Sequence, residues 1–361
     1  MNIFIDFHHG GAARGQVLLL DWRLKHDVSF PNDDMVRKTL PLCRPGDWLT
    51  CPPNFTEQYG GFPAYLHGID LGCGYDEFME TDWDAVMVTR LESQHIFKEL
   101  LKVHSKGNKI KVIGMTGNDH TIYDWEFIHN FMSTDYLSYL MAPNSINKIH
   151  YSQELGLQYG QEFVPITEAS LHTINCFVMC WPTFTQPWVW TRERDAWGTR
   201  CPHCDGAGQG PSPAVVPYGI WKDAEAQLSG YQFKDYGIAC QFPTVPEPEL
   251  PKAYASGALT VHMKTYDGYG YSMLQSIACG RPVIVPRRFH KYRTANRYLI
   301  PWVTCFEVEW EGKSLADTIR YATGSVERAN HYAKACYRAW GGLADWEHEA
   351  FRVSEFLEKL L

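Results

Sequence analysis

One short stretch of this chain combines a glycine turn with side chains that recognise polar ligands. Apolar residues from 258 to 263 predict a buried strand before the turn, and apolar residues at helical spacing from 272 to 279 predict a helix after it. Gly280 is expected to end that helix. A helix N-terminus after a glycine turn presents unpaired N–H groups and the positive end of the helix dipole, so we expect it to bind an anion. The residues concerned are Asp267, Gly268, Tyr269, Gly270 and Gln275.

The stretch from 258 to 286 resembles the donor-site signature of the GT-B glycosyltransferases, in the form typical of their retaining branch. That signature runs Glu, Gly, aromatic, Gly, a second Glu, then a pair of small residues followed by Gly, Arg or Lys, Pro and Val. Here it is written DGYGYSMLQSIACGRPVI, with the spacing kept. Asp267 replaces the first Glu and Gln275 the second. A βαβ unit without a ligand, which also uses glycine turns and capping glycines, is the alternative interpretation.

The resemblance implies a Leloir glycosyltransferase that uses a nucleotide-diphosphate sugar, with a UDP-sugar as the first choice and no catalytic metal. It implies that Asp267 contacts hydroxyls of the sugar, a hexose or a pentose. Backbone N–H groups of Gly268, Tyr269 and Gly270 would face sugar or phosphate. Gln275 would bond the ribose hydroxyls, a role that an amide can fill because it both donates and accepts. The motif favours the retaining reaction.

The elements that must position these residues alternate between strands and helices. Buried strands are predicted at 85–89 and 109–115, and a second series opens at 174–181, with a further strand at 236–241. Such alternation indicates α/β domains with parallel sheets. With the resemblance it implies a GT-B fold of two Rossmann-like domains facing a cleft. We expect an acceptor-side domain at 1–170 and a nucleotide-sugar-binding domain at 171–342. A helix at 343–361 is expected to pack back on the first domain.

Polar residues follow two predicted strands of the N-terminal half. His8, His9, Gly10 and Gly11 come after the first strand, and Asp119 and His120 after the strand at 109–115. Ligands of parallel α/β sheets bind at the carboxyl ends of strands. By the resemblance, Gly10 and Gly11 let the backbone approach the donor or acceptor. His9, Asp119 and Asp267 are the catalytic candidates, and loop caps without a catalytic role are the alternative for the first two.

Basic residues gather in two places. An insertion at 182–218 carries Arg192, Arg194 and Arg200, and no Asp or Glu occurs between Gly268 and Phe306. Positive charge beside a phosphate site attracts and stabilises a pyrophosphate, so Arg287 is a predicted cofactor-binding residue. By the resemblance, the insertion also carries basic groups that neutralise the pyrophosphate, which implies the same role for Arg192, whereas Arg281 stands at a position that the family often uses structurally. The basic run around 287–297 has two other interpretations: it contacts a polyanionic acceptor such as DNA, or it is a solvated helix face.

The same insertion contains a pair of cysteines in the order Cys-Pro-His-Cys. Cys201 and Cys204 have the spacing of a knuckle that binds structural zinc through two thiolates. A structural zinc site needs about four ligands, and a partner pair is not evident in the sequence. An inserted loop with free thiols is therefore the alternative to a zinc site.

Composition restricts the class of protein. The chain has 361 residues, 45% of them hydrophobic, so global disorder is excluded. Its net charge of −8 argues against indiscriminate binding to nucleic acid. The 11 cysteines are an odd number, and the opening residues MNIFIDF predict a strand, so a cytoplasmic location is expected. No apolar run approaches the roughly 20 residues of a membrane span.

The sequence is compatible with three functions. The first is a glycosyltransferase whose acceptor is a soluble glycan, a lipid carrier, a protein or a hydroxymethylated DNA base of the kind that phage enzymes modify. The second is a nucleotide-sugar epimerase with a GT-B fold. The third is a non-catalytic, zinc-bearing protein that binds nucleic acid through the segment around Cys201 and Cys204.

Overall fold

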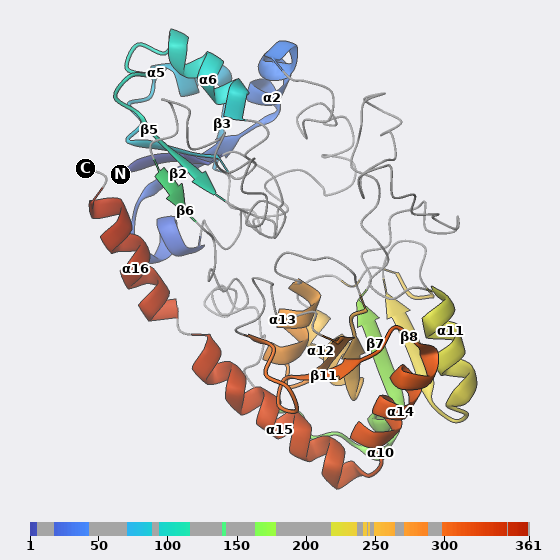
Figure 1. The fold of residues 1–361 in the computed structure, drawn as a ribbon. Helices are drawn as coiled ribbons and strands as arrows, with labels where there is room; N and C mark the ends of the chain where they lie inside the picture. The colour runs from blue at the N-terminus through green and yellow to red at the C-terminus, as the bar shows by residue number, and fades with distance from the viewer. Residues whose placement is uncertain are drawn as a thin grey trace. The chain divides into compact units, whose positions relative to one another are not determined.

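The computed structural model describes residues 1–5, 18–42, 71–88, 94–115, 139–141, 163–177, 218–236, 241–243, 245, 249–263, 271–287, 298–344 and 346–359. These residues fall into two compact units (Figure 1). The first holds the described residues up to 141 together with 346–359, and the second those from 163 to 344. The predicted domain boundaries, the roles given to the two domains and the cleft between them stay predictions.

The first unit is built on a six-stranded parallel sheet with the order β3-β2-β1-β4-β5-β6. Ile3 of β1 pairs with Val28 of β2 on one side and with Ala85 of β4 on the other. The order of strands therefore reverses its direction between β1 and β4, as in doubly wound folds. The strands are β1 (Asn2–Ile5), β2 (Asp27–Pro31), β3 (Gly72–Cys73), β4 (Ala85–Val88), β5 (Lys111–Met115) and β6 (Tyr139–Met141).

Helices cover both faces of this sheet, which explains why its central strands are almost wholly apolar (Figure 1). On the face of α2, α5 and α6, the ring of Phe4 packs 4.7 Å from that of Phe78 and 5.4 Å from that of Trp83. The opposite face carries α16, where Arg23 Nε donates to Glu347 Oε1 at 3.1 Å. The helical segments are η1 (Leu18–Arg23), α2 (Asp33–Thr39), η2 (Leu40–Leu42), α5 (Tyr75–Glu80), α6 (Gln94–Val103) and α16 (Trp346–Glu358).

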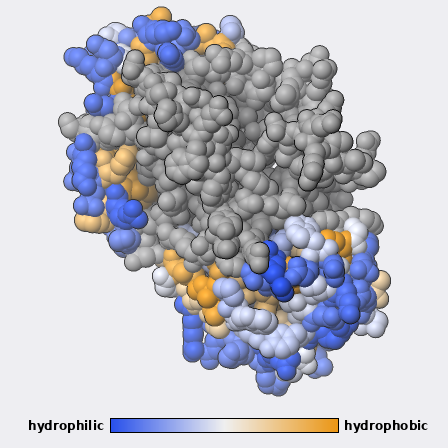
Figure 2. Space-filling view, in the orientation of Figure 1, coloured by the Kyte–Doolittle hydropathy of each residue, from blue (hydrophilic) through white to orange (hydrophobic). Residues whose placement is uncertain are grey.

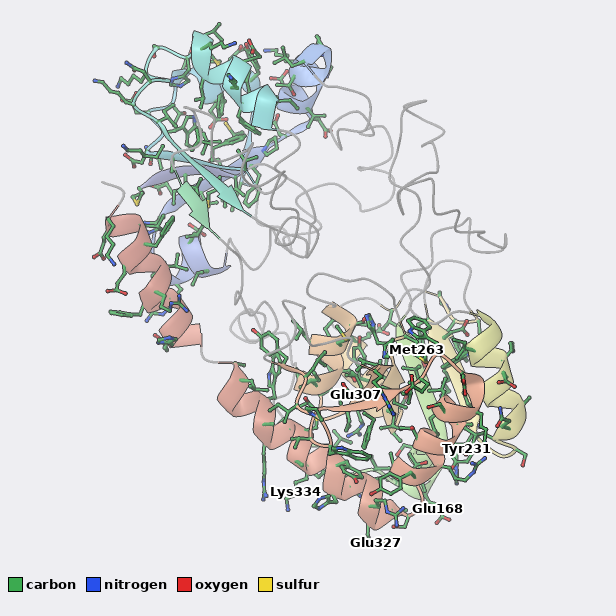
Figure 3. All side chains as sticks on the ribbon, in the orientation of Figure 1. Glu168, Tyr231, Met263, Glu307, Glu327 and Lys334 are labelled. Atoms are coloured by element: carbon green, nitrogen blue, oxygen red, sulfur yellow. The ribbon has the colours of Figure 1, made fainter. Side chains whose placement is uncertain are left out.

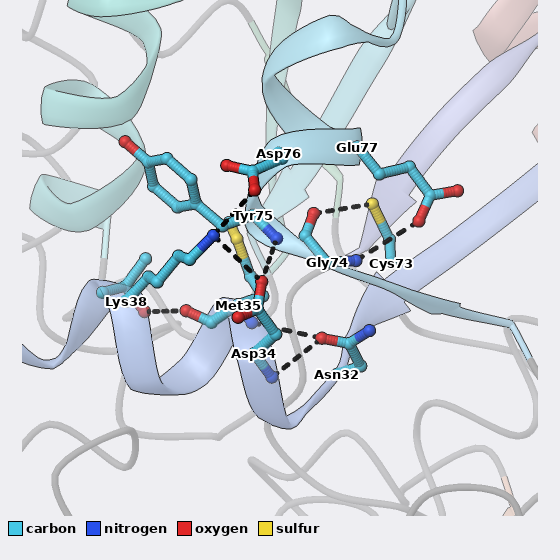
Figure 4. A network of polar contacts seen from close by, with 10 residues as sticks. Asn32, Asp34, Met35, Lys38, Cys73, Gly74, Tyr75, Asp76 and Glu77 are labelled. Atoms are coloured by element: carbon cyan, nitrogen blue, oxygen red, sulfur yellow. Dashed lines mark hydrogen bonds and ion pairs between the residues drawn. The ribbon is translucent and has the colours of Figure 1, made fainter.

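Two of these helices begin in one polar network at the carboxyl ends of β2 and β3 (Figure 4). Asn32 Oδ1 accepts the N–H groups of Asp34 and Met35 at 3.0 and 3.1 Å, which caps α2. Asp34 Oδ2 accepts the N–H of Tyr75 at 3.1 Å, where α5 starts. This hydrogen bond, with the charge of Lys38, lowers the pKa of Asp34 below its ordinary value. The network therefore locks the two short helices to each other.

The second unit is built on a five-stranded parallel sheet with the order β11-β10-β9-β7-β8. Ile174 of β7 pairs with Phe233 of β8 and with Leu259 of β9. Here the order reverses between β7 and β9. The strands are β7 (Thr173–Phe177), β8 (Gln232–Tyr236), β9 (Leu259–Val261), β10 (Val283–Pro286) and β11 (Cys305–Val308).

The helices of this unit form two layers, as right-handed crossovers on the two sides of the reversal require. α11 packs against α14, and α13 packs against α12 and α15. Between these layers the core includes Val261, Ile284 and Phe306 from the strands. The outward surfaces of α11 and α14 are hydrophilic (Figure 2). The helices are α10 (Glu168–Leu171), α11 (Tyr218–Gln227), α12 (Leu250–Ala255), α13 (Tyr271–Ala278), α14 (Gly312–Ala322) and α15 (Val326–Leu343).

One predicted strand has the wrong starting residue. The sequence favoured a strand at 236–241, but β8 spans Gln232–Tyr236. The prediction followed an apolar run, which is typical of a buried strand, whereas β8 lies at the edge of its sheet. Only Phe233 in it is buried, so polar residues such as Lys234 and Asp235 are tolerated there.

Candidate functional site

The predicted glycine turn follows β9, one of the two strands between which the second sheet reverses its order. β9 ends at Val261, His262 and Met263 continue the chain, and α13 begins at Tyr271. Met263 lies at the end of the unit opposite to Glu168 and Glu327 (Figure 3). In open α/β sheets, ligands bind outside the carboxyl ends of the strands at such a reversal. The motif is thus joined to the strand where a ligand is expected.

The strand–helix–strand prediction around the motif is confirmed. β9, α13 and β10 occupy the predicted places, and the buried side chains of α13 include Met273 and Ile277. Gly280 adopts φ +68°, the left-handed conformation expected of a residue that ends a helix. Its N–H donates to Ile277 O and that of Arg281 to Ser276 O, both at 2.9 Å. These two hydrogen bonds close the carboxyl end of α13.

Arg281 is enclosed in the protein and holds backbone carbonyl groups. Its side chain is fully buried, and Nε donates to Gly257 O at 2.7 Å. Nη2 donates to Val164 O at 3.0 Å and to Ala255 O at 3.1 Å. Burial lowers the pKa of Arg281 to about 10, still well above neutrality, so the guanidinium stays charged. This geometry supports the structural interpretation of Arg281 and gives it no contact with a phosphate.

The opposite end of α13 carries a cluster of polar side chains. Tyr254 of α12 is 1% exposed, and its Oη lies 3.1 Å from Ser272 O and 3.2 Å from Gln275 Oε1. The Ser272 Oγ lies 3.2 Å from Nδ1 of His262, which is also buried. Ser272 and Gln275 are partly exposed, while the residue between them on the sheet side, Met273, is fully buried. The accessible face of the first turns of α13 is therefore polar.

Of these residues, sequence reasoning identified only Gln275. His262 carried a usable signal, because it is a polar residue directly after the apolar run of a predicted parallel strand. Tyr254 and Ser272 carried no such signal in the sequence, since only the packing of α12 on α13 brings the Tyr254 hydroxyl to Ser272.

Arg287 lies directly after β10, the neighbour of β9, and is exposed. Its Nε lies 2.9 Å from Oε1 of Glu309, and the two side chains are 60% and 50% exposed. The sequence shows no acid in this part of the chain, but parallel pairing with β11 brings Glu309 beside it. Exposed ion pairs contribute only about 0–1 kcal/mol, so this pair does not commit Arg287 to a structural role.

Most predicted site residues lie outside the described residues, and their roles stay predictions. What the structure gives is the strands that lead to them: β1 ends at Ile5, at the reversal of the first sheet, and β5 ends at Met115. The residues outside are His8, His9, Gly10, Gly11, Asp119, His120, Arg192, Arg194, Arg200, Cys201, Cys204, Asp267, Gly268, Tyr269 and Gly270.

Among the described residues, no group of three or more His, Cys, Asp or Glu is arranged to hold a metal ion. Cys201 and Cys204 lie outside these residues, so their zinc site stays a prediction. None of the helices in the described ranges combines the length and the hydrophobicity that crossing a membrane requires.

The fold of the chain matches solved glycosyltransferases over almost its whole length. Sucrose-phosphate synthase from Thermosynechococcus elongatus aligns with a TM-score of 0.59 and 14% identity, over 100% of this chain and 99% of the other. Anabaena HepE, solved in complex with UDP and glucose, aligns with a TM-score of 0.56 and 12% identity, over 99% of both chains. A glycosyltransferase from Rickettsia africae aligns with a TM-score of 0.51 and 10% identity, over 99% and 98%.

At the level of sequence, no protein-family model matches this chain and no curated protein does. The likeness to the solved structures establishes the fold alone: this is an α/β chain with parallel sheets, and its fold is similar to that of GT-B glycosyltransferases. The predicted fold class is confirmed at that level. The donor motif and the cleft stay predictions.

Proposed function

We propose that this protein is a glycosyltransferase that moves a sugar from a nucleotide-diphosphate sugar, most simply a UDP-sugar, to an acceptor. One observation carries the proposal: the chain leaves β9 for the glycine motif at the reversal point of a sheet whose fold matches GT-B enzymes. HepE, which has this fold, was solved with UDP and glucose bound.

The described residues support a position for the nucleoside diphosphate, and the sequence motif gives one for the sugar. The diphosphate would lie at the amino end of α13, where N–H groups and the helix dipole favour negative charge. Gln275, one turn further along the helix, would bond the ribose, and Asp267 would contact the sugar. Arg287 after the neighbouring strand would exchange Glu309 for a phosphate oxygen, because its present ion pair is weak.

The reaction would break the bond between the anomeric carbon and the phosphate oxygen and form a bond from that carbon to an acceptor oxygen. The nucleoside diphosphate leaves with the electron pair of the broken bond, and the acceptor loses a proton to a base, for which His9 and Asp119 are the candidates. Backbone N–H groups at α13 and arginine side chains stabilise the charge that develops on the leaving diphosphate. The sequence motif favours retention of configuration.

For the acceptor, we put forward a hydroxymethylated DNA base, on the grounds of the basic residues between 287 and 297. Transfer of labelled sugar to hydroxymethylated DNA, compared with unmodified DNA of the same sequence, tests this choice. If the donor is turned over but neither DNA is labelled, the acceptor is instead a glycan, a lipid carrier or a protein.

A thermal-shift screen of the full chain against UDP-, GDP- and ADP-sugars tests the donor class. A ligand at about 100 times its Kd stabilises the native state by about 2.7 kcal/mol, so the matching donor should raise the Tm clearly. Release of the nucleoside diphosphate is then measured with the donor that binds. Asp267→Ala should lose this activity with an unchanged Tm in the absence of ligand. If none of the nucleotide sugars binds or turns over, the proposed function is wrong.

A further inference from the structure

The Tyr254 hydroxyl is placed between two groups that both accept hydrogen bonds. Its Oη lies 3.1 Å from the backbone oxygen of Ser272 and 3.2 Å from Oε1 of Gln275. A phenolic hydroxyl carries one hydrogen and therefore cannot donate to both. Tyr254 is 1% exposed, so its hydroxyl is held away from bulk solvent.

The two acceptors differ in what they can change. The Ser272 carbonyl belongs to the backbone of α13 and accepts only. The Gln275 amide can turn by half a rotation, which exchanges its oxygen for an NH₂ group that donates. With the amide turned, Gln275 Nε2 donates to Tyr254 Oη, and Tyr254 donates to Ser272 O. Each hydrogen is then used once, and both short contacts become hydrogen bonds.

This orientation decides which atom Gln275 offers to a ligand. When Nε2 faces Tyr254, the amide oxygen faces away from it, on the partly exposed side of α13. Among the described residues, the contact that fixes the amide is the one to Tyr254. A ribose hydroxyl can donate as well as accept, and an outward amide oxygen takes its hydrogen as a carboxylate would.

We propose that Tyr254 is a positioning residue for the donor: it turns the Gln275 amide so that oxygen, and not nitrogen, faces the ribose of a nucleoside diphosphate. The inference rests on the proposed function, since it concerns the same site. It accounts for the replacement of an acidic residue by Gln275 without loss of an acceptor for the ribose hydroxyls.

The test measures binding of UDP and of 2′,3′-dideoxy-UDP to the full chain by titration calorimetry. Wild type should prefer UDP, because only UDP donates to the Gln275 oxygen. In Tyr254→Phe the amide loses its fixed orientation, and this preference should shrink by about fivefold, the value of one hydrogen bond. In Gln275→Glu a carboxylate offers oxygen in either orientation, so adding Tyr254→Phe to it should leave the preference unchanged.

Tyr231→Phe is the matched control. Its hydroxyl lies 3.2 Å from Thr323 Oγ1, a contact between the α11–β8 turn and the end of α14. This variant loses a comparable hydrogen bond in the same unit and should keep the wild-type preference for UDP. A Tyr254→Phe protein that folds, binds UDP and keeps the full preference overturns the positioning role alone. A wild-type chain that binds neither nucleotide overturns the role and the proposed function together.

Discussion

The carboxyl end of α13 is enclosed by the protein, whereas its amino end presents polar side chains to the surface. At the enclosed end, Gly280 turns the chain and the buried guanidinium of Arg281 donates to two separate backbone segments, at 164 and at 255–257. Burial also raises the pKa of Cys336, a thiol close to Arg281, well above its ordinary value, so this thiol stays uncharged. At the other end, Ser272 and Gln275 are partly exposed beside Tyr254.

The two ends of α13 therefore differ in role: one end holds the helix in place, and the other would meet the ligand. A binding site needs groups whose positions are fixed by their surroundings before the ligand arrives. Here the half of the sequence pattern that keeps the residues of the family signature, Gly280-Arg281-Pro282, anchors the helix to β9, β10 and the segment at 164. The half that would meet the ligand can then vary, as Asp267 and Gln275 do, without loss of the fold. Three substitutions test this division.

Arg281→Met should have the largest effect on stability. The change keeps the bulk of the side chain but removes the donor to the carbonyl of Gly257, a buried contact, and to those of Val164 and Ala255, which are partly buried contacts. Each unsatisfied group costs about 1–3 kcal/mol, and relief of the buried charge offsets part of this, so we expect a loss of about 3 kcal/mol. Urea unfolding measures it. A loss below that of the exposed control Arg287→Met would contradict a structural role for Arg281.

Gly280→Ala should destabilise the enclosed end by about 2 kcal/mol, because an L-residue at φ +68° is strained. Its Cβ would also lie 3.1 Å from Tyr337 Cβ and 3.2 Å from Ala333 O of α15. Gly341→Ala is the control, since a Cβ there meets nothing within 4 Å and alanine favours the helix. The comparison uses the midpoints of urea unfolding. Equal midpoints for the two variants would show that Gly280 is not required at this end.

Glu309→Gln should have the smallest effect on stability, within about 1 kcal/mol, because its pair with Arg287 is exposed. Its effect should lie in binding: freeing Arg287 raises the affinity for UDP if that arginine contacts the diphosphate, and Arg287→Leu lowers it. Titration calorimetry at two salt concentrations checks both, since added salt should reduce the difference. Unchanged affinity in Arg287→Leu would remove Arg287 from the donor site.

Local sequence alone determined β9, α13, β10 and the turn at Gly280. The physical reason is that strand and helix periodicity and a left-handed glycine are encoded within a few neighbouring residues. It also determined the α/β class, because alternating buried strands and helices are visible without any partner. It misplaced β8, whose polar residues are acceptable only because the sheet ends there.

Tertiary structure decided what lies beside the motif. The order of strands puts β9 at the reversal, and no pattern within β9 encodes that order. Parallel pairing of β10 with β11 gave Arg287 the acid that its own stretch of sequence lacks. Packing of α12 on α13 brought the Tyr254 hydroxyl to Gln275, and thereby the group that would set the direction of its amide. These are contacts between residues far apart in the chain, which periodicity and spacing do not record.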